Sequence, residues 1–439
     1  MKIAWFSPRV PEHSEIAKNT ERLEGELRRH FDARFFAEQP SGFREAGTGR
    51  HFHATVGHIP TDLLLALNEV DLPIYNLGNN PAFFAKTWFL SQRKPGIVIL
   101  HDLKLHHFFE GIYRERLGDE RQYLEFMDEY YGAPGLEAGR LYWQQQIFID
   151  FMAENFPMTA WGVRNALAVV AHTQPTVEAV SHATGLPTLR NDLPYIAHPA
   201  REPAGEAGRA FTPERLVRVA IFGYLNVNRR VLEFFHALAG MEERACFEVH
   251  LYGTLLQRYE DDVKRDVATL GLRDQVRFHG YVTEEALDAG LAGCDLAVNL
   301  RFPTMGEASA SQLRIWDHAL PSLVTCIDGY AAMPEDAVSF VRPDRERTDI
   351  QDHLRGFLAD PAAYRSKGAR GREILLERHR PATYVERLAG LTEHLAVLRS
   401  RHVRLETAQR TGRAIGVWSH LAPRSGSEER CAQAIAELF

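Results

Sequence analysis

Short apolar runs alternate with amphipathic stretches along most of the chain, which is the pattern of strands and helices in an α/β protein. An apolar run over residues 2–7 predicts a first strand, and Leu23 and Leu27, at i, i+4 spacing, predict a helix over 16–30. Further buried strands are predicted over residues 72–77, 96–100, 166–171, 194–197, 218–222, 247–252, 276–280, 296–300 and 322–327. Helices are predicted over residues 123–135, 141–156, 174–183, 231–239 and most of 349–396.

The predicted elements fall into two sets, separated by a polar segment rich in Gly, Pro and Ala. We expect a first domain over residues 1–200, a linker over 201–214, a second domain over 215–375 and crossover helices over 376–400. The tail, 401–439, contains a predicted strand from residue 414, a Pro/Gly/Ser loop and an amphipathic helix, and so repeats the pattern of the N-terminus. It is either the start of a further module or an extra helix that packs on the first domain.

Composition narrows the class of protein. Hydrophobic residues make up 45% of the chain and charged residues 25%, which is the usage of a globular protein, and a net charge of -7 gives no global attraction to nucleic acid. The four cysteines are widely spaced and fit no metal-binding motif, which favours a reducing compartment. No stretch reaches the roughly 20 apolar residues that span a bilayer. We therefore expect a cytoplasmic protein, for which peripheral contact is the only type of membrane association compatible with the sequence.

The segment over residues 295–328 carries the strongest local signal. A buried strand is followed by a turn with Pro303 and Gly306, a helix that begins near 309–311, and a second buried strand. The N-terminus of a helix that follows a parallel strand attracts phosphate, because its backbone N–H groups are unpaired and its dipole is positive. Glu307 and Arg301 would flank such an anion site. In the alternative interpretation, the serines merely cap an ordinary helix.

Polar residues also follow two strands of the first domain. Asn79 and Asn80 come after the strand over 72–77, and His101 and Asp102 after the one over 96–100, so all four are expected in one crevice. The segment HDLKLHH contains three histidines, but their spacing matches no zinc motif. His101 is either a catalytic or sugar-binding imidazole or a structural residue in the cleft wall, and its position alone does not decide between them.

Two adjacent arginines begin a helix of the second domain. The strand over 218–222 runs into GYLNVNRR, so that Arg229 and Arg230 lie where the helix dipole disfavours positive charge unless an anion is bound. An anion site and a solvated pair of arginines are equally compatible with this position.

Seven short motifs occur in order over about residues 1–395. They are SEIAKNT (14–20), GNN (78–80), HDLKLHH (101–107), AHP (197–199), GYLNVNRR (223–230), VRFHGYV (276–282) and NLRFPTMGEASASQLRIW (299–316). Together they resemble a branch of glycosyltransferase family 4, whose members are retaining enzymes of the GT-B architecture. The resemblance implies an α/β fold of two Rossmann-like domains that face a cleft, with C-terminal helices that return toward the N-terminal domain.

The same resemblance implies roles for particular residues. His101 would lie beside the reacting centre, and Glu307 would hold hydroxyls of the transferred sugar. The donor diphosphate would be bound by Arg229, Arg230, Gly306, Ser309, Ala310 and Ser311. The nucleotide would be bordered by Gly223, Asn226, Gly280, Tyr281 and Val282. The cleft or acceptor side would contain Ser14, Glu15, Asn79, Asn80, Asp102 and Arg301.

These residues predict a retaining, metal-independent glycosyltransferase that moves a sugar from a nucleotide-diphosphate sugar, UDP- or GDP-linked, to an unidentified acceptor. No cofactor and no metal are expected, because cations and a helix N-terminus would stabilise the leaving diphosphate. Glu15 and Ala310 stand where the branch has Gly, and Lys18 and Asn19 replace Asp-Tyr. Arg314 stands where many family 4 enzymes have a Glu that grips the ribose, but this branch commonly has Arg there. Two alternatives follow: a GT-B protein that has lost catalysis and acts as a binding or assembly partner, and a nucleotide-sugar hydrolase or epimerase.

Overall fold

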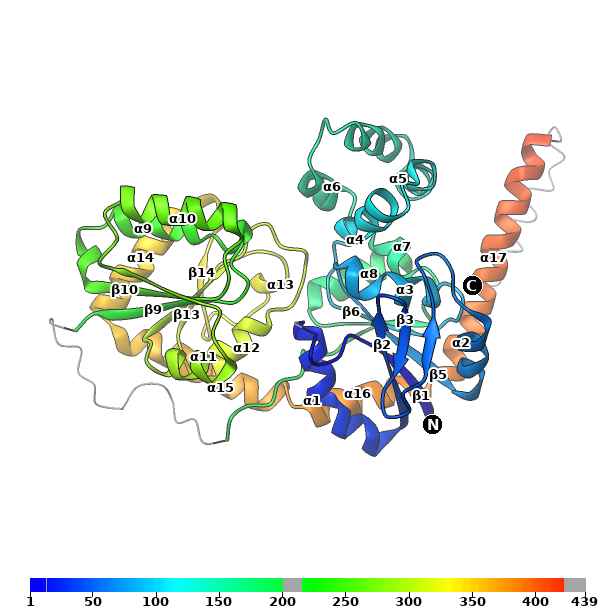
Figure 1. Cartoon of the computed structure of the whole chain (residues 1–439), viewed down its shortest axis with the longest axis horizontal. Helices are drawn as coiled ribbons and strands as arrows, with labels where there is room; N and C mark the ends of the chain where they lie inside the picture. The colour runs from blue at the N-terminus through cyan, green and yellow to red at the C-terminus, as the bar shows by residue number, and fades with distance from the viewer. Residues whose placement is uncertain (13, 200–214, 422–439) are drawn as a thin grey trace.

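The computed structural model describes residues 1–12, 14–199 and 215–421. Two separate sheets form the centres of two domains, as Figure 1 shows. The first sheet has eight strands in the order β4-β3-β2-β1-β5-β6-β7-β8. These strands are β1 (Lys2–Phe6), β2 (Asp32–Gln39), β3 (Gly42–Glu45), β4 (His51–His53), β5 (Leu72–Leu77), β6 (Ile97–Leu100), β7 (Ala168–Ala171) and β8 (Thr188–Arg190). The six from β2 to β8 pair in parallel, and β3 and β4 add an antiparallel edge.

Helices cover both faces of the first sheet, and its central strands are therefore apolar almost throughout. Every residue of β5, β6 and β7 is buried. The helices of this domain are α1 (Glu15–His30), α2 (Thr61–Ala66), α3 (Pro81–Ser91), α4 (His106–Glu110), α5 (Glu120–Trp143), α6 (Ile149–Asn155), α7 (Thr159–Val163) and α8 (Gln174–Thr184). α5 and α6 form an arm that projects from the rest of the domain (Figure 1).

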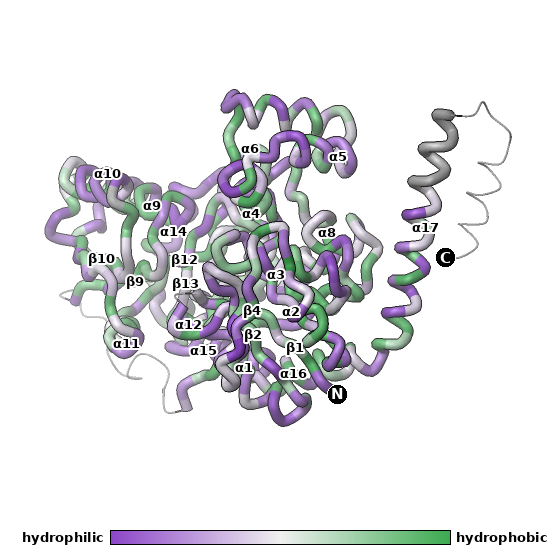
Figure 2. Tube along the Cα trace, turned by 45° about the vertical axis from the view of Figure 1, so that its right-hand side comes forward, coloured by the Kyte–Doolittle hydropathy of each residue, from purple (hydrophilic) through white to green (hydrophobic). Residues whose placement is uncertain are grey.

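The second sheet has six strands, all parallel, in the order β11-β10-β9-β12-β13-β14. They are β9 (Val217–Phe222), β10 (Phe247–Tyr252), β11 (Val276–Gly280), β12 (Leu296–Asn299), β13 (Ser322–Thr325) and β14 (Ser339–Val341). The helices of this domain are α9 (Val231–Ala239), α10 (Gln257–Thr269), α11 (Glu284–Ala292), α12 (Ala310–Asp317), α13 (Asp328–Ala331), α14 (Glu346–Ala359) and α15 (Pro361–Arg378). Figure 2 shows hydrophobic residues gathered along the sheets, whereas the outer helix α10 is largely hydrophilic.

The chain returns to the first domain through α16 (Pro381–Glu393) and α17 (Leu395–Leu421), as predicted. Tyr384, Val385 and Leu388 of α16 are buried in the same apolar cluster as Trp5 and Leu27 of the first domain. The C-terminal part of the chain therefore completes the core of the N-terminal domain.

Two predicted strands are wrong. Residues 194–197 form no strand, because β8 is already the edge of the sheet and the Tyr195 N–H donates instead to the His379 carbonyl. Residues 414–421 continue helix α17, where a strand was expected. The predicted linker, 201–214, and the last part of the tail, 422–439, lie outside the described residues.

Candidate active site

Arg229 is the buried cation of the second domain. Only 4% of this residue is exposed. Its guanidinium donates to the Phe222 carbonyl at 2.6 Å, to Asn299 Oδ1 at 3.0 Å and to Ser311 Oγ at 3.1 Å. Gly223 makes room for it, since a Cβ there would lie 2.9 Å from Arg229 Nη2. Burial and the charge of nearby Arg301 lower the pKa of Arg229 to about 9, so it is still a cation at neutral pH.

The helix that receives Arg229 is α12, whose start was predicted correctly. Ser309 is its N-cap, with Oγ accepting from the Gln312 N–H at 3.1 Å, and Ala310 is its first residue. The side-chain amide of Asn299, at the end of β12, donates to Ser309 Oγ at 3.1 Å and to Gln312 Oε1 at 2.9 Å. Ser309 therefore does cap the helix, but Ser311 holds Arg229 instead, so capping is not the only role of the two serines.

Arg230 points elsewhere, although it is adjacent to Arg229. It has a φ of 57°, and its guanidinium forms ion pairs with Glu346 at 2.6 Å and with Glu233 at 2.8 Å. Two carboxylates thus hold Arg230 away from the group around Arg229.

The residues predicted to border the nucleotide lie at the ends of β9 and β11, on either side of the end of β10. Gly253 and Gly280 both have positive φ, and the Gly253 N–H donates to the Gly280 carbonyl at 2.7 Å. Asn226 Oδ1 is buried and accepts no hydrogen bond from the described residues. Tyr281 is 73% exposed, whereas Val282 packs against an apolar cluster. The ends of β9 and β11 therefore supply a polar acceptor, Asn226 Oδ1, and an aromatic ring, that of Tyr281.

Glu307 lies in the loop between β12 and α12, within a group of polar side chains. Its Oε2 accepts from the Met305 N–H at 2.8 Å, and its Oε1 lies 3.2 Å from Arg301 Nε and 3.4 Å from the Tyr330 hydroxyl. Gly306, predicted to lie in this loop, has a φ of 75°. Glu307 and Arg301 thus form the pair that was expected to flank the anion site.

Asp102 faces this group from the first domain. Its Oδ2 accepts from the Asn79 N–H at 2.7 Å. Burial, and then the negative charge of Glu307, raise the pKa of Asp102 to about 7, against the opposing effects of the Asn79 hydrogen bond and of Arg301. Asp102 is therefore poised to exchange a proton near neutral pH.

The two domains meet at this loop through backbone hydrogen bonds. The Met305 carbonyl accepts from the N–H groups of Leu103 and Lys104, at 2.8 and 2.9 Å. The Gly306 carbonyl accepts from Thr176 Oγ1 at 3.2 Å, and a Cβ at Gly306 would lie 2.5 Å from Leu103 Cβ. The predicted motifs around His101 and Glu307, about two hundred residues apart in the sequence, are therefore in direct contact.

His101 uses both ring nitrogens within the protein. Its Nε2 lies 2.9 Å from Asn76 Oδ1, and its Nδ1 lies 3.3 Å from Nε2 of His172. Burial, and then the neighbouring His172, lower the pKa of His101. In this arrangement His101 has no free nitrogen for a sugar hydroxyl.

The other two histidines of HDLKLHH are structural and do not converge with His101. His106 is fully buried, with Nδ1 2.6 Å from the Phe156 carbonyl and Nε2 2.7 Å from the Tyr123 hydroxyl, and so ties α4 to the α5–α6 arm. His107 Nε2 lies 3.5 Å from Asp150. No three His, Cys, Asp or Glu side chains among the described residues are grouped as a metal site.

Ser14 and Asn80 have capping roles. Ser14 Oγ accepts from the Ile16 N–H and begins α1, and Asn80 Oδ1 accepts from the Ala82 N–H and begins α3. Both helix N-termini face the cleft, but their side-chain acceptors are occupied by the backbone.

Glu15, the unexpected carboxylate of the first loop, belongs to a network of ion pairs between the domains. It lies 3.0 Å from Lys18, which in turn lies 2.7 Å from Glu284 at the start of α11. Arg314 of α12 donates to the other oxygen of Glu284. Burial alone would raise the pKa of Glu284, but the bonds from Lys18 and Arg314 lower it to about 2.

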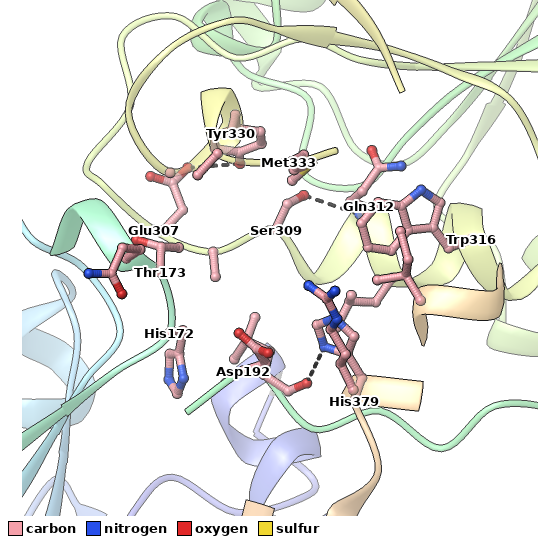
Figure 3. A pocket seen from close by; sticks show the side chains of 18 of the residues that line it. His172, Thr173, Asp192, Glu307, Ser309, Gln312, Trp316, Tyr330, Met333 and His379 are labelled. Carbon is pink, nitrogen blue, oxygen red and sulfur yellow. Dashed lines mark hydrogen bonds between the residues drawn. The ribbon is translucent and has the colours of Figure 1, made fainter. Parts of the chain in front are cut away.

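A pocket lies between the domains beside Glu307 (Figure 3). It is lined by His172, Thr173, Asp192 and Leu193 of the first domain and by Glu307, Ser309, Trp316, Tyr330, Met333 and His379 of the second part of the chain. Apart from Glu307 and Ser309, these lining residues were not predicted from the sequence as site residues. A signal existed for two of them, because His172 and Thr173 directly follow β7 just as His101 follows β6.

The two facing Rossmann-like domains with their returning helices are the GT-B fold, and solved structures of that fold resemble the chain. Anabaena HepE, solved with UDP, has a TM-score of 0.57 at 15% identity and covers 90% of this chain and 100% of its own. Sucrose-phosphate synthase from Thermosynechococcus elongatus has a TM-score of 0.58 at 15% identity, over 90% of this chain and 99% of its own. WaaG, a glycosyltransferase involved in lipopolysaccharide biosynthesis, has a TM-score of 0.52 at 13% identity, over 89% and 99%. HepE has also been solved with UDP-glucose.

By sequence, the chain matches no protein-family model and no curated protein. Within the described residues, no helix has the length and apolar character needed to cross a bilayer.

Proposed function

We propose that this protein is a retaining glycosyltransferase, related to family 4, that uses a nucleotide-diphosphate sugar. The observation that carries the proposal is Arg229: a buried cation that no carboxylate pairs with among the described residues, held at the N-terminus of α12. Burial of a charge without a direct ion pair is costly, so the burial of Arg229 favours an anionic ligand. A diphosphate is the anion that fits an arginine fork beside a helix N-terminus.

The arrangement assigns a role to each part of the site. Arg229 and the N-terminus of α12 would stabilise the charge that develops on the leaving diphosphate, without help from a metal. Glu307 would accept hydrogen bonds from hydroxyls of the transferred sugar. Because no second carboxylate among the described residues is placed as a nucleophile, we propose transfer on one face of the sugar, in which the leaving phosphate takes the proton of the acceptor.

The nucleotide and the acceptor would occupy different domains. Residues 215–375 would bind the donor, with Asn226 and the end of β11 next to the base, and residues 1–200 would bind the acceptor. The complexes of HepE with UDP and UDP-glucose support UDP as the first nucleotide to test. The free thiols of Cys246, Cys294 and Cys326 support a cytoplasmic location.

The test is nucleotide affinity, measured calorimetrically with UDP, GDP and ADP on the wild type, Arg229→Ala and the control Arg218→Ala. Arg218 is a half-exposed cation of β9, the strand that precedes Arg229 in the chain, and it pairs with Glu248. Loss of a charge-assisted hydrogen bond costs about 1.5–3 kcal/mol, so Arg229→Ala should weaken binding about 10- to 150-fold and Arg218→Ala should not. Absence of binding by any nucleotide would overturn the proposal in favour of a non-catalytic partner. Donor turnover that needs no acceptor would favour a hydrolase.

A further inference from the structure

A continuous hydrogen-bond chain crosses the carboxyl ends of the first sheet at the cleft. Asn76 Nδ2 donates to the Phe6 carbonyl at 3.0 Å, and Asn76 Oδ1 lies 2.9 Å from His101 Nε2. His101 Nδ1 lies 3.3 Å from His172 Nε2, and His172 Nδ1 lies 2.8 Å from the Asn191 carbonyl. The two imidazole rings are thus joined nitrogen to nitrogen, with a partner fixed at each outer end.

The outer partners determine where the protons of the two rings lie. The Phe6 carbonyl can only accept, so Asn76 presents its oxygen to His101, and His101 Nε2 must carry a hydrogen. The Asn191 carbonyl can also only accept, so His172 Nδ1 must carry a hydrogen. If both rings were neutral, the two remaining nitrogens would face each other with only lone pairs between them.

We propose that His101 and His172 bind one additional proton between them and act as a single cationic pair at the floor of the donor cleft. The proton forms the bond between His101 Nδ1 and His172 Nε2, and it comes from solvent. A second proton would place two hydrogens in the same gap. His172 is then a positioning residue for His101, which acts by its charge because neither of its nitrogens is free.

The surroundings of the pair act in both directions. Burial lowers the pKa of each ring, and each ring's neighbours modify this effect: His172 lowers the pKa of His101 further, whereas the Asn191 carbonyl and then Asp192 raise the pKa of His172 and His379 lowers it. Asn76 Oδ1 and the Asn191 carbonyl favour binding of the additional proton by the pair. Without that proton, the buried hydrogen bond between His101 Nδ1 and His172 Nε2 is lost. Among the charged and titratable side chains of the described residues, only His172 acts on His101; Asp102, Glu307 and Arg301, in the adjoining loops, interact electrostatically with one another.

The first experiment needs no donor. Ring nitrogens of the full-length protein, labelled with 15N-histidine, are followed by NMR from pH 5 to 9 in the wild type, His172→Gln and the control His236→Gln. A glutamine amide at 172 can donate to His101 Nδ1 without an extra proton, and His236 is an exposed histidine paired with Asp266. We expect one shared proton in the wild type and the control at pH 6–7, and a neutral His101 protonated on Nε2 in His172→Gln. Two neutral rings in the wild type at pH 6–7 would overturn the proposal, whether or not the variant folds.

The second experiment rests on the proposed function, because it measures UDP affinity across the same pH range. A unit charge roughly 10 Å from a diphosphate, at an effective dielectric constant of about 20, changes affinity about tenfold. Wild-type affinity should therefore fall about tenfold as the pair loses its proton, and the affinity of His172→Gln should lack this step. An identical pH profile in both proteins would refute the role of the charge. Absence of UDP binding would refute the proposed function and leave the NMR result to decide on the proton.

Discussion

Lys18 at the start of α1 and Glu284 at the start of α11 form an ion pair of 2.7 Å that joins the two domains across the mouth of the cleft. Their side chains are 32% and 49% exposed, so the pair contributes little to stability, at most about 1 kcal/mol. The same energy matters more for an equilibrium between open and closed cleft, since 1 kcal/mol changes the population ratio about fivefold.

We therefore predict that Lys18→Met leaves the melting temperature within about two degrees of the wild type but opens the cleft. Small-angle scattering at low salt should show a larger radius of gyration for Lys18→Met, and added salt should remove the difference by weakening the pair in the wild type. Lys264→Met, which removes an exposed ion pair with Glu260 on α10, is the control. Equal scattering from Lys18→Met and wild type at low salt would show that the pair does not hold the cleft closed.

Asp102→Asn should be increasingly stabilising as pH rises. The folded protein raises the pKa of Asp102 from 3.8 to about 7, so the ionised form is disfavoured on folding; this penalty is absent below pH 4, grows between pH 4 and 7 and is complete above pH 7. Asparagine keeps the acceptor for the Asn79 N–H and removes the charge. We expect a gain of about 1–3 kcal/mol in unfolding free energy at pH 8 and no gain at pH 4, measured by urea denaturation. A gain that is the same at both pH values would exclude Asp102 as the titrating group.

Gly223→Ala should weaken both stability and nucleotide binding. Gly223 has a φ of 108°, a conformation that side chains rarely adopt, and the added Cβ would press on Arg229. We expect a loss of about 1–3 kcal/mol in unfolding free energy, together with reduced UDP affinity. Gly271→Ala is the matched control, because Gly271 also has positive φ but has no atom within 4 Å of its Cβ position. Equal UDP affinity of Gly223→Ala and the wild type would contradict the placement of the donor diphosphate at Arg229.

Leu388→Ala should destabilise the first domain, although residue 388 follows the second domain in the sequence. Leu388 is fully buried in the cluster that includes Trp5 and Leu27. Removal of a buried leucine side chain costs about 2–5 kcal/mol. Hydrogen exchange should show the loss of protection in β1 and α1 rather than in β9 to β12, and loss confined to the second domain would contradict the assignment. Leu376→Ala, a change at a half-exposed leucine of α15, is the control.

The sequence predicts β1, β5, β6, β7, β9, β10, β11, β12 and β13 in their order, because most of these parallel strands are continuous apolar runs. It misses the short strands β3, β4, β8 and β14 at the sides of the sheets, and also β2, where charged residues interrupt the apolar ones. It also predicts that polar residues such as His101 and Ser309 lie at strand ends and helix starts. It does not separate Arg229 from Arg230, since their different directions depend on a positive φ at one residue and on Glu346, more than a hundred positions away. The sequence also does not predict that His172 is the partner of His101, because His172 lies 71 positions later and contacts His101 only when β6 and β7 pair.

Lys18 and Arg314 illustrate a second limit. Lys18 departs from the pattern of the branch, and Arg314 stands where many family 4 enzymes have Glu, but the structure joins both to Glu284 in one network. Glu15, the residue that most threatened a donor site by its charge, is turned toward Lys18 within that network. The ion-pair partners of Lys18 and Arg314 come from a distant segment of the chain, so a local sequence pattern does not predict them.

The packing of α16 against β1 and α1 has a consequence for biosynthesis. During translation, the eight strands of the first sheet emerge early, but the side chains of Tyr384, Val385 and Leu388 that seal one of its faces emerge only after the whole second domain. The apolar surface of the first domain that α16 covers therefore stays exposed while the second domain is synthesised. The need for chaperones is therefore greatest while the second domain is being made, and the first domain acquires its full stability only once α16 has emerged.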